Sequence, residues 1–205
     1  MSSPARWTSL ARRSSDPWAP PRAVLDADVI FSRVLHELFG RLASELQLLT
    51  LIWSDQLLDE AAAALVARKP TTPEVAARWV GYLRDVFPDG RVQLGLLSGS
   101  EFAKMTTDVG DQHVCELAVV GGAQLLVTSD GSYLREELIA HGVSVVTPDE
   151  FLVTALSEHS AAVLATVEAQ AAVWGGGRSV DSLLAAYGRA GAGAFAAMAR
   201  NALTG

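Results

Sequence analysis

The sequence is poor in cysteine and in long apolar runs. Its 205 residues include one cysteine, Cys115, which excludes both a disulfide framework and a metal site built of thiolates. The longest candidate for a membrane-spanning run, residues 46–53, is interrupted by Gln47 and Thr50 and is too short to cross a bilayer. The arginines near the N-terminus are not followed by the apolar segment that a secretory signal requires. We therefore expect a protein of the reducing cytoplasm, with no membrane partner.

Positive charge is also scarce. The chain carries 16 lysines and arginines against 23 aspartates and glutamates, which gives a net charge of −7. Proteins that coat nucleic acid usually present a basic surface, so this balance argues against that class. It leaves nucleases open, because bound metal ions neutralise carboxylates and present positive charge to phosphate. Half of the residues are hydrophobic and 19% are charged, which is typical of one globular domain, with or without an appendage.

The order of the apolar segments predicts an α/β fold. Residues 1–21 are rich in proline and lack periodicity, and we interpret them as a mobile leader. From residue 22 onward, short apolar runs alternate with segments whose apolar residues recur every three or four positions. The predicted strands are 23–27, 92–94, 124–128 and 143–146, and the predicted helices are 30–42, 55–67, 72–87, 111–120 and 132–140. This alternation, with short turns marked by glycine, predicts a parallel sheet flanked by helices.

The C-terminal segment has a different composition. It is rich in alanine, contains no strand-like run and is interrupted by three glycines at 175–177. This pattern predicts one helix over 149–173 and one or two shorter helices over 180–203. We interpret residues 153–205 as a helical appendage to a domain that spans residues 22–152.

Four acidic residues stand where a ligand site is expected in such a fold. Asp26 and Asp130 end strand-like runs, Asp111 begins a predicted helix, and Glu60 borders the apolar face of another. Open α/β sheets bind their ligands at the carboxyl ends of the strands. Carboxylates gathered there repel one another unless a hard divalent cation joins them, and Mg²⁺ and Mn²⁺ prefer oxygen ligands of this kind. The arrangement predicts a divalent metal site, for Mg²⁺ in the first place and Mn²⁺ as an alternative.

Each of these acids, taken alone, also fits an ordinary structural role. An aspartate after a strand often caps the next helix, an acid in a first helical turn gains from the helix dipole, and Ser-Asp-Gly is a common turn. Four further residues are candidates for supporting the site: Asp28, Asp108, Thr128 and Ser129. Asp28 is the better candidate for the helix cap, and the two hydroxyls suit a phosphate or a water on the metal. Only the combination of the acids favours a shared site.

The order of the motifs resembles that of the PIN domain. The segments that carry the resemblance are 24–30, 53–60, 108–118 and 126–130, and residues 145–152 are similar to the segment that closes the domain. The likeness covers about residues 22–152, and the order and spacing of the motifs together carry it. The chain departs from the family at Asp28, where asparagine is more frequent.

This resemblance implies both a fold and an activity. The fold is a three-layer α/β/α sandwich with a central parallel sheet, and the activity is that of a metal-dependent endoribonuclease, which hydrolyses RNA phosphodiester bonds. The acidic cluster implied is Asp26, Glu60, Asp111 and Asp130. Asp26 and Asp111 would bind Mg²⁺ or Mn²⁺ directly, Glu60 and Asp130 directly or through water, and Thr128 would orient the reactants.

The resemblance also bears on partners. Many bacterial PIN proteins are the toxin of a VapBC-like type II toxin–antitoxin pair, which implies an antitoxin protein as partner and, as one option, a homodimer. This chain is longer than the compact toxins, and its helical tail looks like one found on a subset of PIN proteins. The tail leaves open whether the usual dimer and partner geometry applies.

Two other functions remain open from the sequence. The acids could form a non-catalytic site that captures a partner peptide bearing arginine or lysine. The Asp-Ala-Asp run at 26–28 also resembles the nucleophile motif of haloacid-dehalogenase-like phosphatases. In that family a threonine or serine ends the next strand, and a lysine follows it along the chain. Here Lys104 precedes Thr128, so the order is wrong.

The remaining chemistry-bearing side chains receive simpler interpretations. The histidines are not spaced as metal ligands, and we expect each to be solvated or to cap a helix: His36, His113, His141 and His159. We expect Cys115 to be an inert thiol in the core. The candidates for contacts to RNA phosphates are Arg33, Arg68, Lys69 and Arg91.

Overall fold

The computed structural model describes most of the chain. The described residues are 19–68, 70–95, 101–174 and 179–204. The predicted leader up to residue 18 and the three glycines at 175–177 lie outside them. Within the described ranges, no helix is long and apolar enough to cross a membrane.

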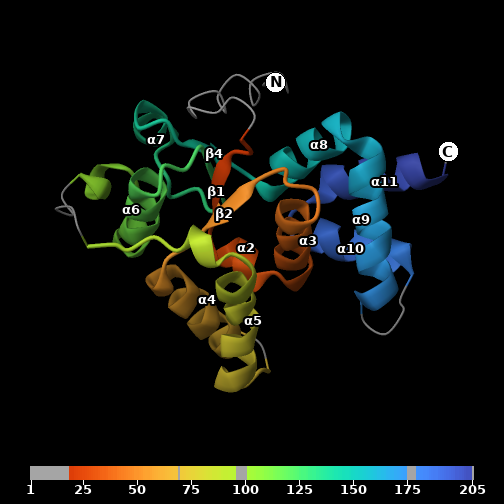
Figure 1. Cartoon of the computed structure of the whole chain (residues 1–205), viewed down its shortest axis with the longest axis horizontal. Helices are drawn as coiled ribbons and strands as arrows, with labels where there is room; N and C mark the ends of the chain where they lie inside the picture. Colours follow the sequence, from red (N-terminus) through yellow and green to blue (C-terminus); the bar gives the residue numbers. More distant parts are fainter. Residues whose placement is uncertain (1–18, 69, 96–100, 175–178, 205) are drawn as a thin grey trace. The chain divides into compact units, whose positions relative to one another are not determined.

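The chain forms two compact units, each made of two stretches of sequence (Figure 1). The first, which we call the sheet unit, comprises Met1–Phe31 and Leu49–Val146. The second, which we call the helical unit, comprises Ser32–Leu48 and Thr147–Gly205. Every predicted acidic site residue belongs to the sheet unit.

Four short strands of the sheet unit form one parallel sheet in the order β2-β1-β3-β4. They are β1 (Arg22–Leu25), β2 (Thr50–Ile52), β3 (Leu125–Val127) and β4 (Ser144–Val146). Nearly all of their residues are buried, as the continuous apolar runs lead one to expect. The structure thus confirms the predicted α/β class with a central parallel sheet.

One strand is missing from the predictions and one predicted strand is wrong. The missing strand is β2, which lies within the apolar run at 46–53, and it was not marked because Gln47 and Thr50 interrupt that run. The predicted strand at 92–94 does not join the sheet, and Arg91 instead forms a single parallel bridge with Trp53. Backbone hydrogen bonds from Trp53 N to Gly90 O (2.9 Å) and from Val92 N to Trp53 O (2.8 Å) satisfy this stretch without a ladder.

The register of the sheet aligns the carboxyl ends of its central strands. Leu25 pairs with Val127, and the backbone N–H of Asp26 donates to the Val127 carbonyl at 3.0 Å. The backbone N–H of Thr128 donates in the same way to the Val146 carbonyl of β4 at 2.9 Å. The residues that follow β1, β3 and β4 therefore lie along one edge of the sheet.

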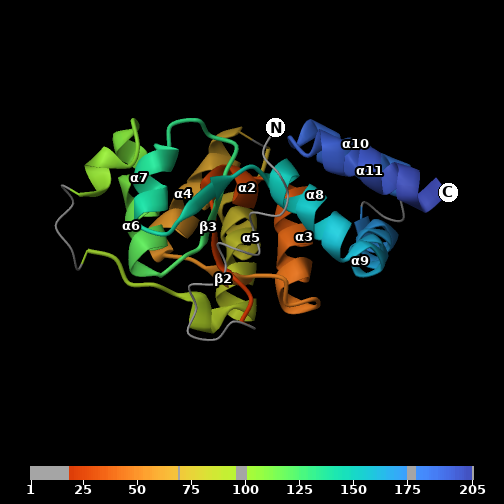
Figure 2. The same ribbon diagram turned by 90° about the horizontal axis from the view of Figure 1, so that it is seen from above.

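Five α-helices complete the described part of the sheet unit. They are α2 (Ala27–Phe31), α4 (Asp55–Arg68), α5 (Pro73–Val86), α6 (Gln112–Val120) and α7 (Arg135–Ala140), joined with the 3-10 turns η3 (Pro88–Gly90), η4 (Phe102–Lys104) and η5 (Val109–Asp111). Two side chains cap helices in this unit: Ser54 accepts a hydrogen bond from Leu57 N at 3.2 Å, and Thr72 accepts one from Val75 N at 3.4 Å. Helices α4 and α5 pack side by side as a hairpin (Figures 1 and 2).

Two helix predictions in this region fail for local reasons. The predicted helix 30–42 is interrupted at Ser32, whose backbone is extended, with φ −79° and ψ 107°. The predicted helix 132–140 begins only at Arg135. Its first residues are drawn into an extended contact instead, because Tyr133 forms an antiparallel bridge with Thr106.

The helical unit consists of five helices in the described residues. They are α3 (Arg33–Ser44), α8 (Pro148–Glu158), α9 (Ser160–Val173), α10 (Val180–Arg189) and α11 (Gly193–Thr204). The single helix predicted over 149–173 is divided at His159, whose backbone leaves the helical region with φ −130° and ψ 42°. Helices α10 and α11 pack side by side (Figure 2).

The helical unit is larger than the predicted appendage. Its C-terminal stretch begins at Thr147 rather than at residue 153. The unit also includes α3, which the sequence pattern places in the domain 22–152. The apolar face of α3 explains this difference, because Leu38 and Phe39 are fully buried and the Phe39 ring lies 5.2 Å from that of Phe151. Long helices with apolar faces pack together irrespective of their distance in sequence.

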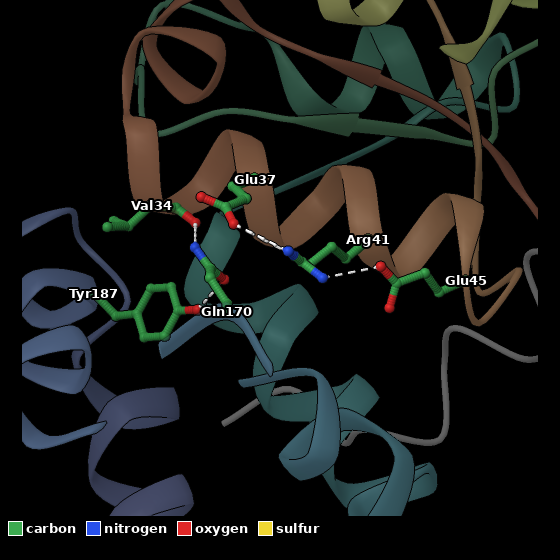
Figure 3. A network of polar contacts seen from close by, with 6 residues as sticks. All are labelled: Val34, Glu37, Arg41, Glu45, Gln170 and Tyr187. Atoms are coloured by element: carbon green, nitrogen blue, oxygen red, sulfur yellow. Dashed lines mark hydrogen bonds and ion pairs between the residues drawn. The ribbon is translucent and has the colours of Figure 1, made fainter. Parts of the chain in front are cut away.

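A buried polar network ties the helices of this unit together (Figure 3). Gln170 of α9 is completely buried, and its Nε2 donates to the Val34 carbonyl of α3 at 3.1 Å. Its Oε1 accepts a hydrogen bond from the Tyr187 hydroxyl of α10 at 2.6 Å. Both ends of the amide are therefore satisfied, and one side chain links three helices.

Candidate acidic site at the carboxyl ends of the strands

The carboxyl ends of β1 and β3 meet where the strand order reverses. After β1 the chain first adds β2 on one side, and later adds β3 on the other side. In open parallel sheets such a switch point is where ligands bind. Asp26 follows β1 and Thr128 follows β3, and the Thr128 hydroxyl donates to Asp26 Oδ2 at 2.7 Å. Two of the predicted residues therefore stand together at the position favoured for a site.

Asp26 is the most deeply buried of the predicted acids, with 6% of its surface exposed. Its Oδ2 also accepts a hydrogen bond from the Tyr133 hydroxyl at 2.9 Å, and its Oδ1 accepts one from Ala27 N at 2.7 Å. Burial raises the pKa of Asp26 to about 6, against the Thr128 hydrogen bond, and the charge of Asp28 raises it further. Ionising this carboxylate is therefore costly without a further positive charge.

Asp28 joins the first turn of α2 to the end of β3. Its Oδ2 accepts a hydrogen bond from Ser129 N at 2.9 Å, while its buried Oδ1 has no hydrogen-bond partner in the described part of the chain. Burial raises the pKa of Asp28, opposed by the Ser129 hydrogen bonds, and the charge of Asp130 adds to the rise. The expected role of Asp28 as a helix cap is wrong, because α2 begins at Ala27 and Asp26 occupies the preceding position.

Ser132 binds two of the predicted acids at once. Its backbone N–H donates to Asp130 Oδ1 at 2.7 Å, and its hydroxyl donates to Asp111 Oδ2 at 2.6 Å. Asp130 N in turn donates to Thr128 Oγ1 at 2.9 Å. A continuous chain of hydrogen bonds therefore runs from Asp111 through Ser132, Asp130 and Thr128 to Asp26.

Asp111 lies at the end of η5, directly before α6. Burial raises the pKa of Asp111, the Ser132 hydrogen bond opposes this, and the charges of Asp108, Asp130 and Glu60 raise it further. Asp108 caps η5, because its Oδ1 accepts a hydrogen bond from Gly110 N at 2.8 Å. Asp108 is exposed, so its influence on Asp111 is one of charge.

Glu60 of α4 faces His113 of α6. Glu60 Oε2 lies 3.2 Å from His113 Nε2, with the distance of an ion pair but without the alignment of a hydrogen bond. The other ring nitrogen, Nδ1, lies 2.8 Å from the Gly110 carbonyl. Burial lowers the pKa of His113, but Glu60 and the Gly110 carbonyl raise it, and the net shift is upward. The raised pKa favours the protonated form of His113 beside the acids.

The expectation that the histidines are solvated or cap helices is wrong for two of them. The side chain of His113 is 9% exposed and that of His36 is buried, whereas His141 and His159 are exposed. The His113 side chain lies against Glu60 instead of pointing into solvent. Cys115 is buried, and burial raises its pKa to about 12, which confirms an inert core thiol.

The acids are coupled by charge but do not form a finished coordination shell. Among the described residues, no three histidine, cysteine or acidic side chains stand close enough to hold one metal ion. Four of the carboxylates instead accept hydrogen bonds from hydroxyls or backbone amides: Asp26, Asp28, Asp111 and Asp130. The donor chemistry still suits a hard cation, since every acid offers oxygen and the buried Asp28 Oδ1 is unpaired. Glu60, with 46% of its side chain exposed, and the exposed Asp130 have room to turn.

Three residues at this site are missing from the predicted set of site residues. Ser132 and Tyr133 follow the predicted turn at Asp130 directly, and their position beside two hydroxyl-bearing residues is the one signal that marks them. The pattern places both in a predicted helix, which in the structure begins only at Arg135. The expected role of His113, in solvent or as a helix cap, does not place it against Glu60.

Two of the four candidates for contacts to RNA phosphates already have partners in the structure. Arg91 Nε donates to Asp55 Oδ2 at 3.0 Å, and the Arg68 guanidinium lies 5.9 Å from the centre of an aromatic ring of α2. Lys69 lies outside the described residues, and Arg33 belongs to the helical unit. Arg91 and Arg68 would have to leave these partners in order to balance the charge of a phosphate.

The fold and the site together define an α/β domain with a parallel sheet and an electrostatically coupled acidic cluster at the switch point. Comparison of the chain with protein-family models, with curated proteins and with solved structures finds no match. A functional assignment therefore rests on the geometry of the site and on the resemblance in sequence.

Proposed function

We propose that the sheet unit is a PIN-like three-layer α/β/α domain and that the protein is a metal-dependent endoribonuclease. The observation that carries this is the meeting of Asp26 with residues 128–130 at the switch point, directly beside Asp28. Asp111 and Glu60 belong to the same electrostatic cluster, because each of their charges acts on a neighbouring acid. Such mutually repelling carboxylates at a ligand-binding edge are what a divalent cation would neutralise.

In this proposal each acid has a distinct task. Asp26 and Asp111 would hold Mg²⁺ or Mn²⁺ directly, and Glu60 and Asp130 would bind it directly or through water. Thr128 keeps Asp26 oriented through the 2.7 Å hydrogen bond. When bound, the ion would provide a nucleophilic water at neutral pH and offset the charge on the phosphate and the leaving oxygen. The net charge of −7 is then no obstacle to an RNA substrate.

We further propose that the protein is a cytoplasmic toxin of the VapBC-like type, with an antitoxin as its partner and a homodimer as one assembly. The sequence resemblance supports this part. The acids also suit such a partner, because an arginine or lysine inserted among them would cancel their repulsion and exclude the metal. A small neighbouring reading frame for a DNA-binding protein would support the pairing.

Cleavage of total cellular RNA tests the enzymatic proposal. The full-length protein is incubated with RNA and MnCl₂, MgCl₂ or a chelator, and the new ends are mapped by sequencing. We expect metal-dependent cuts by the wild type and none by Asp26→Asn or Asp111→Asn. Asp89→Asn, at an exposed position of η3, is the matched control and should cut normally. Unchanged cleavage by either site variant, with its fold verified by circular dichroism, would refute the assignment.

A second candidate is a non-catalytic interaction module. It is favoured by the observation that, in the described part of the chain, no three candidate ligands converge on one point. Such a module would bind an arginine-rich peptide and leave metal ions alone. Calorimetric titration with MnCl₂ separates the two, because absence of heat at millimolar metal supports the module.

A further inference from the structure

The segment at residues 128–133 lies between β3 and α7. It makes hydrogen bonds to Asp26, Asp28 and Asp111 and contains Asp130, and its described hydrogen bonds do not reach Glu60 or Asp108. Its first residues bind Asp26 through the Thr128 hydroxyl and Asp28 through Ser129 N. Its last two residues extend the pattern, since Ser132 binds Asp111 and Tyr133 binds Asp26. These two contacts reach acids on different elements of the sheet unit.

Tyr133 is built into the sheet unit as a fixed donor. Its side chain is buried, with 5% of the residue exposed, and its hydroxyl donates to Asp26 Oδ2 at 2.9 Å. Because a carboxylate oxygen accepts hydrogen bonds and a phenol carries one O–H donor, Tyr133 serves Asp26 as the donor.

The backbone around Ser132 and Tyr133 is fixed independently of the acids. Thr107 N donates to the Ser132 carbonyl at 2.9 Å, and Leu134 N donates to the Met105 carbonyl at 2.7 Å. These bonds flank the antiparallel bridge that Tyr133 forms at 106. These backbone contacts hold the dipeptide in place without using either hydroxyl.

We propose that Ser132 and Tyr133 are positioning residues of the metal site: from one rigid dipeptide, their hydroxyls orient Asp111 and Asp26 so that both carboxylates can bind one ion. This rests on the proposed function, which makes those two acids the direct ligands. Groups that hydrogen-bond to metal ligands fix the orientation of the ligands, and their loss typically weakens metal affinity about 10- to 100-fold.

A purely structural role makes a different prediction. If the two hydroxyls only stabilised the fold, their removal would lower the melting temperature and leave metal affinity unchanged in the folded protein. Metal affinity of the folded chain therefore separates the two roles. The helical unit provides a matched control, because the Tyr187 hydroxyl also makes a buried hydrogen bond, of 2.6 Å to Gln170.

The experiment is calorimetric titration of MnCl₂ into the full-length wild type, Tyr133→Phe, Ser132→Ala and Tyr187→Phe, with each fold verified by circular dichroism. We expect at least about 10-fold weaker Mn²⁺ binding in the first two variants and unchanged binding in Tyr187→Phe. Ser132→Thr keeps a hydroxyl at the same position and should restore affinity to near that of the wild type.

The outcomes are distinct. Wild-type affinity in both Tyr133→Phe and Ser132→Ala overturns the positioning role, and so does a failure of both variants to fold. If only Tyr133→Phe fails to fold, Ser132→Ala and its threonine rescue decide. A wild type that binds no Mn²⁺ removes the proposed metal site, and the positioning role with it. If the wild type binds Mn²⁺ but cuts no RNA, and the two variants bind Mn²⁺ more weakly, the positioning role stands and the ribonuclease proposal falls.

Discussion

The two units of this protein each bury a tyrosine hydroxyl, but they give it opposite kinds of acceptor. In the helical unit Tyr187 donates to the neutral amide of Gln170, whose other end is also paired. In the sheet unit Tyr133 donates to the carboxylate of Asp26, and the pKa of that carboxylate is still raised to about 6. The first network is closed and neutral, whereas the second retains unbalanced charge.

This difference separates a structural network from a functional one. A fully satisfied neutral network stabilises the packing of the helices around it. A cluster whose acids raise the pKa of one another costs stability, and such clusters are found at sites that bind or react. Variants of the network in the helical unit should therefore change stability but not metal binding. Variants of the acidic cluster in the sheet unit should change metal binding.

The largest expected effect is on metal binding. Replacing Asp111 by asparagine removes a proposed direct ligand, so Mn²⁺ affinity should fall by at least about 100-fold, beyond the loss expected for residues that only support a ligand. Gln170→Leu in the helical unit should leave Mn²⁺ affinity unchanged. Calorimetric titration of both variants with MnCl₂ measures this contrast. Equal Mn²⁺ affinities in the two variants would contradict the distinction between the networks.

The next effect concerns the stability of the helical unit. Gln170→Leu keeps the volume but leaves the Tyr187 hydroxyl buried without its acceptor, whereas the Val34 carbonyl keeps its hydrogen bond within α3. Because one orphaned buried group costs about 1–3 kcal/mol, the free energy of unfolding should fall by roughly 1–3 kcal/mol. Urea unfolding followed by circular dichroism gives the value. A loss below about 0.5 kcal/mol would mean that the network contributes little.

The third effect is a pH dependence of stability in the sheet unit. Because the pKa of Asp26 is raised from 3.8 to about 6, the folded state holds this proton more tightly than the unfolded state does. Stability should therefore be greatest below pH about 4, fall as pH rises to about 6 and then level off, with a total loss of up to roughly 3 kcal/mol.

Asp26→Asn removes this dependence, and at pH about 8 it should stabilise the fold by roughly 1–2 kcal/mol after the loss of the Ala27 hydrogen bond. Urea unfolding of wild type and variant across this range measures the difference. A variant that is less stable than the wild type at neutral pH would show that the carboxylate is not under strain there.

The smallest effect belongs to the ion pairs on α3 shown in Figure 3. Arg41 lies 3.3 Å from Glu37 and 3.0 Å from Glu45, and all three side chains are partly exposed. Arg41→Met should therefore lower stability by at most about 0.5 kcal/mol, and added salt should remove the difference. Unfolding at low and high salt tests this, and a salt-independent loss would point to packing by the arginine stem instead.

The sheet and the acids could be predicted because their signals are local. Apolar runs that end in Asp26 and Asp130 mark buried strands and place their ends at one edge. The strand β2 was not predicted, although it lies in the apolar run at 46–53, because Gln47 and Thr50 interrupt the pattern there. The division at Ser32 depends on one residue with an extended backbone in a stretch whose apolar spacing continues through it.

The supporting residues of both networks could not be predicted, because contacts between distant segments create them. Tyr133 acts at the site only because its backbone pairs with Thr106 rather than entering a helix. Gln170 is a polar residue in an alanine-rich helix, and nothing in the helical period indicates its partners on α3 and α10. The sequence shows which side chains carry charge, whereas contacts between distant segments decide which hydroxyls donate hydrogen bonds to them.

Anomalous diffraction from crystals grown with MnCl₂ tests the central claim most directly. We predict a manganese peak within about 2–2.6 Å of carboxylate oxygens of both Asp26 and Asp111, with Glu60 or Asp130 turned towards it. A peak elsewhere in the molecule, or no peak at the carboxyl ends of β1 and β3 at saturating metal, would contradict the account.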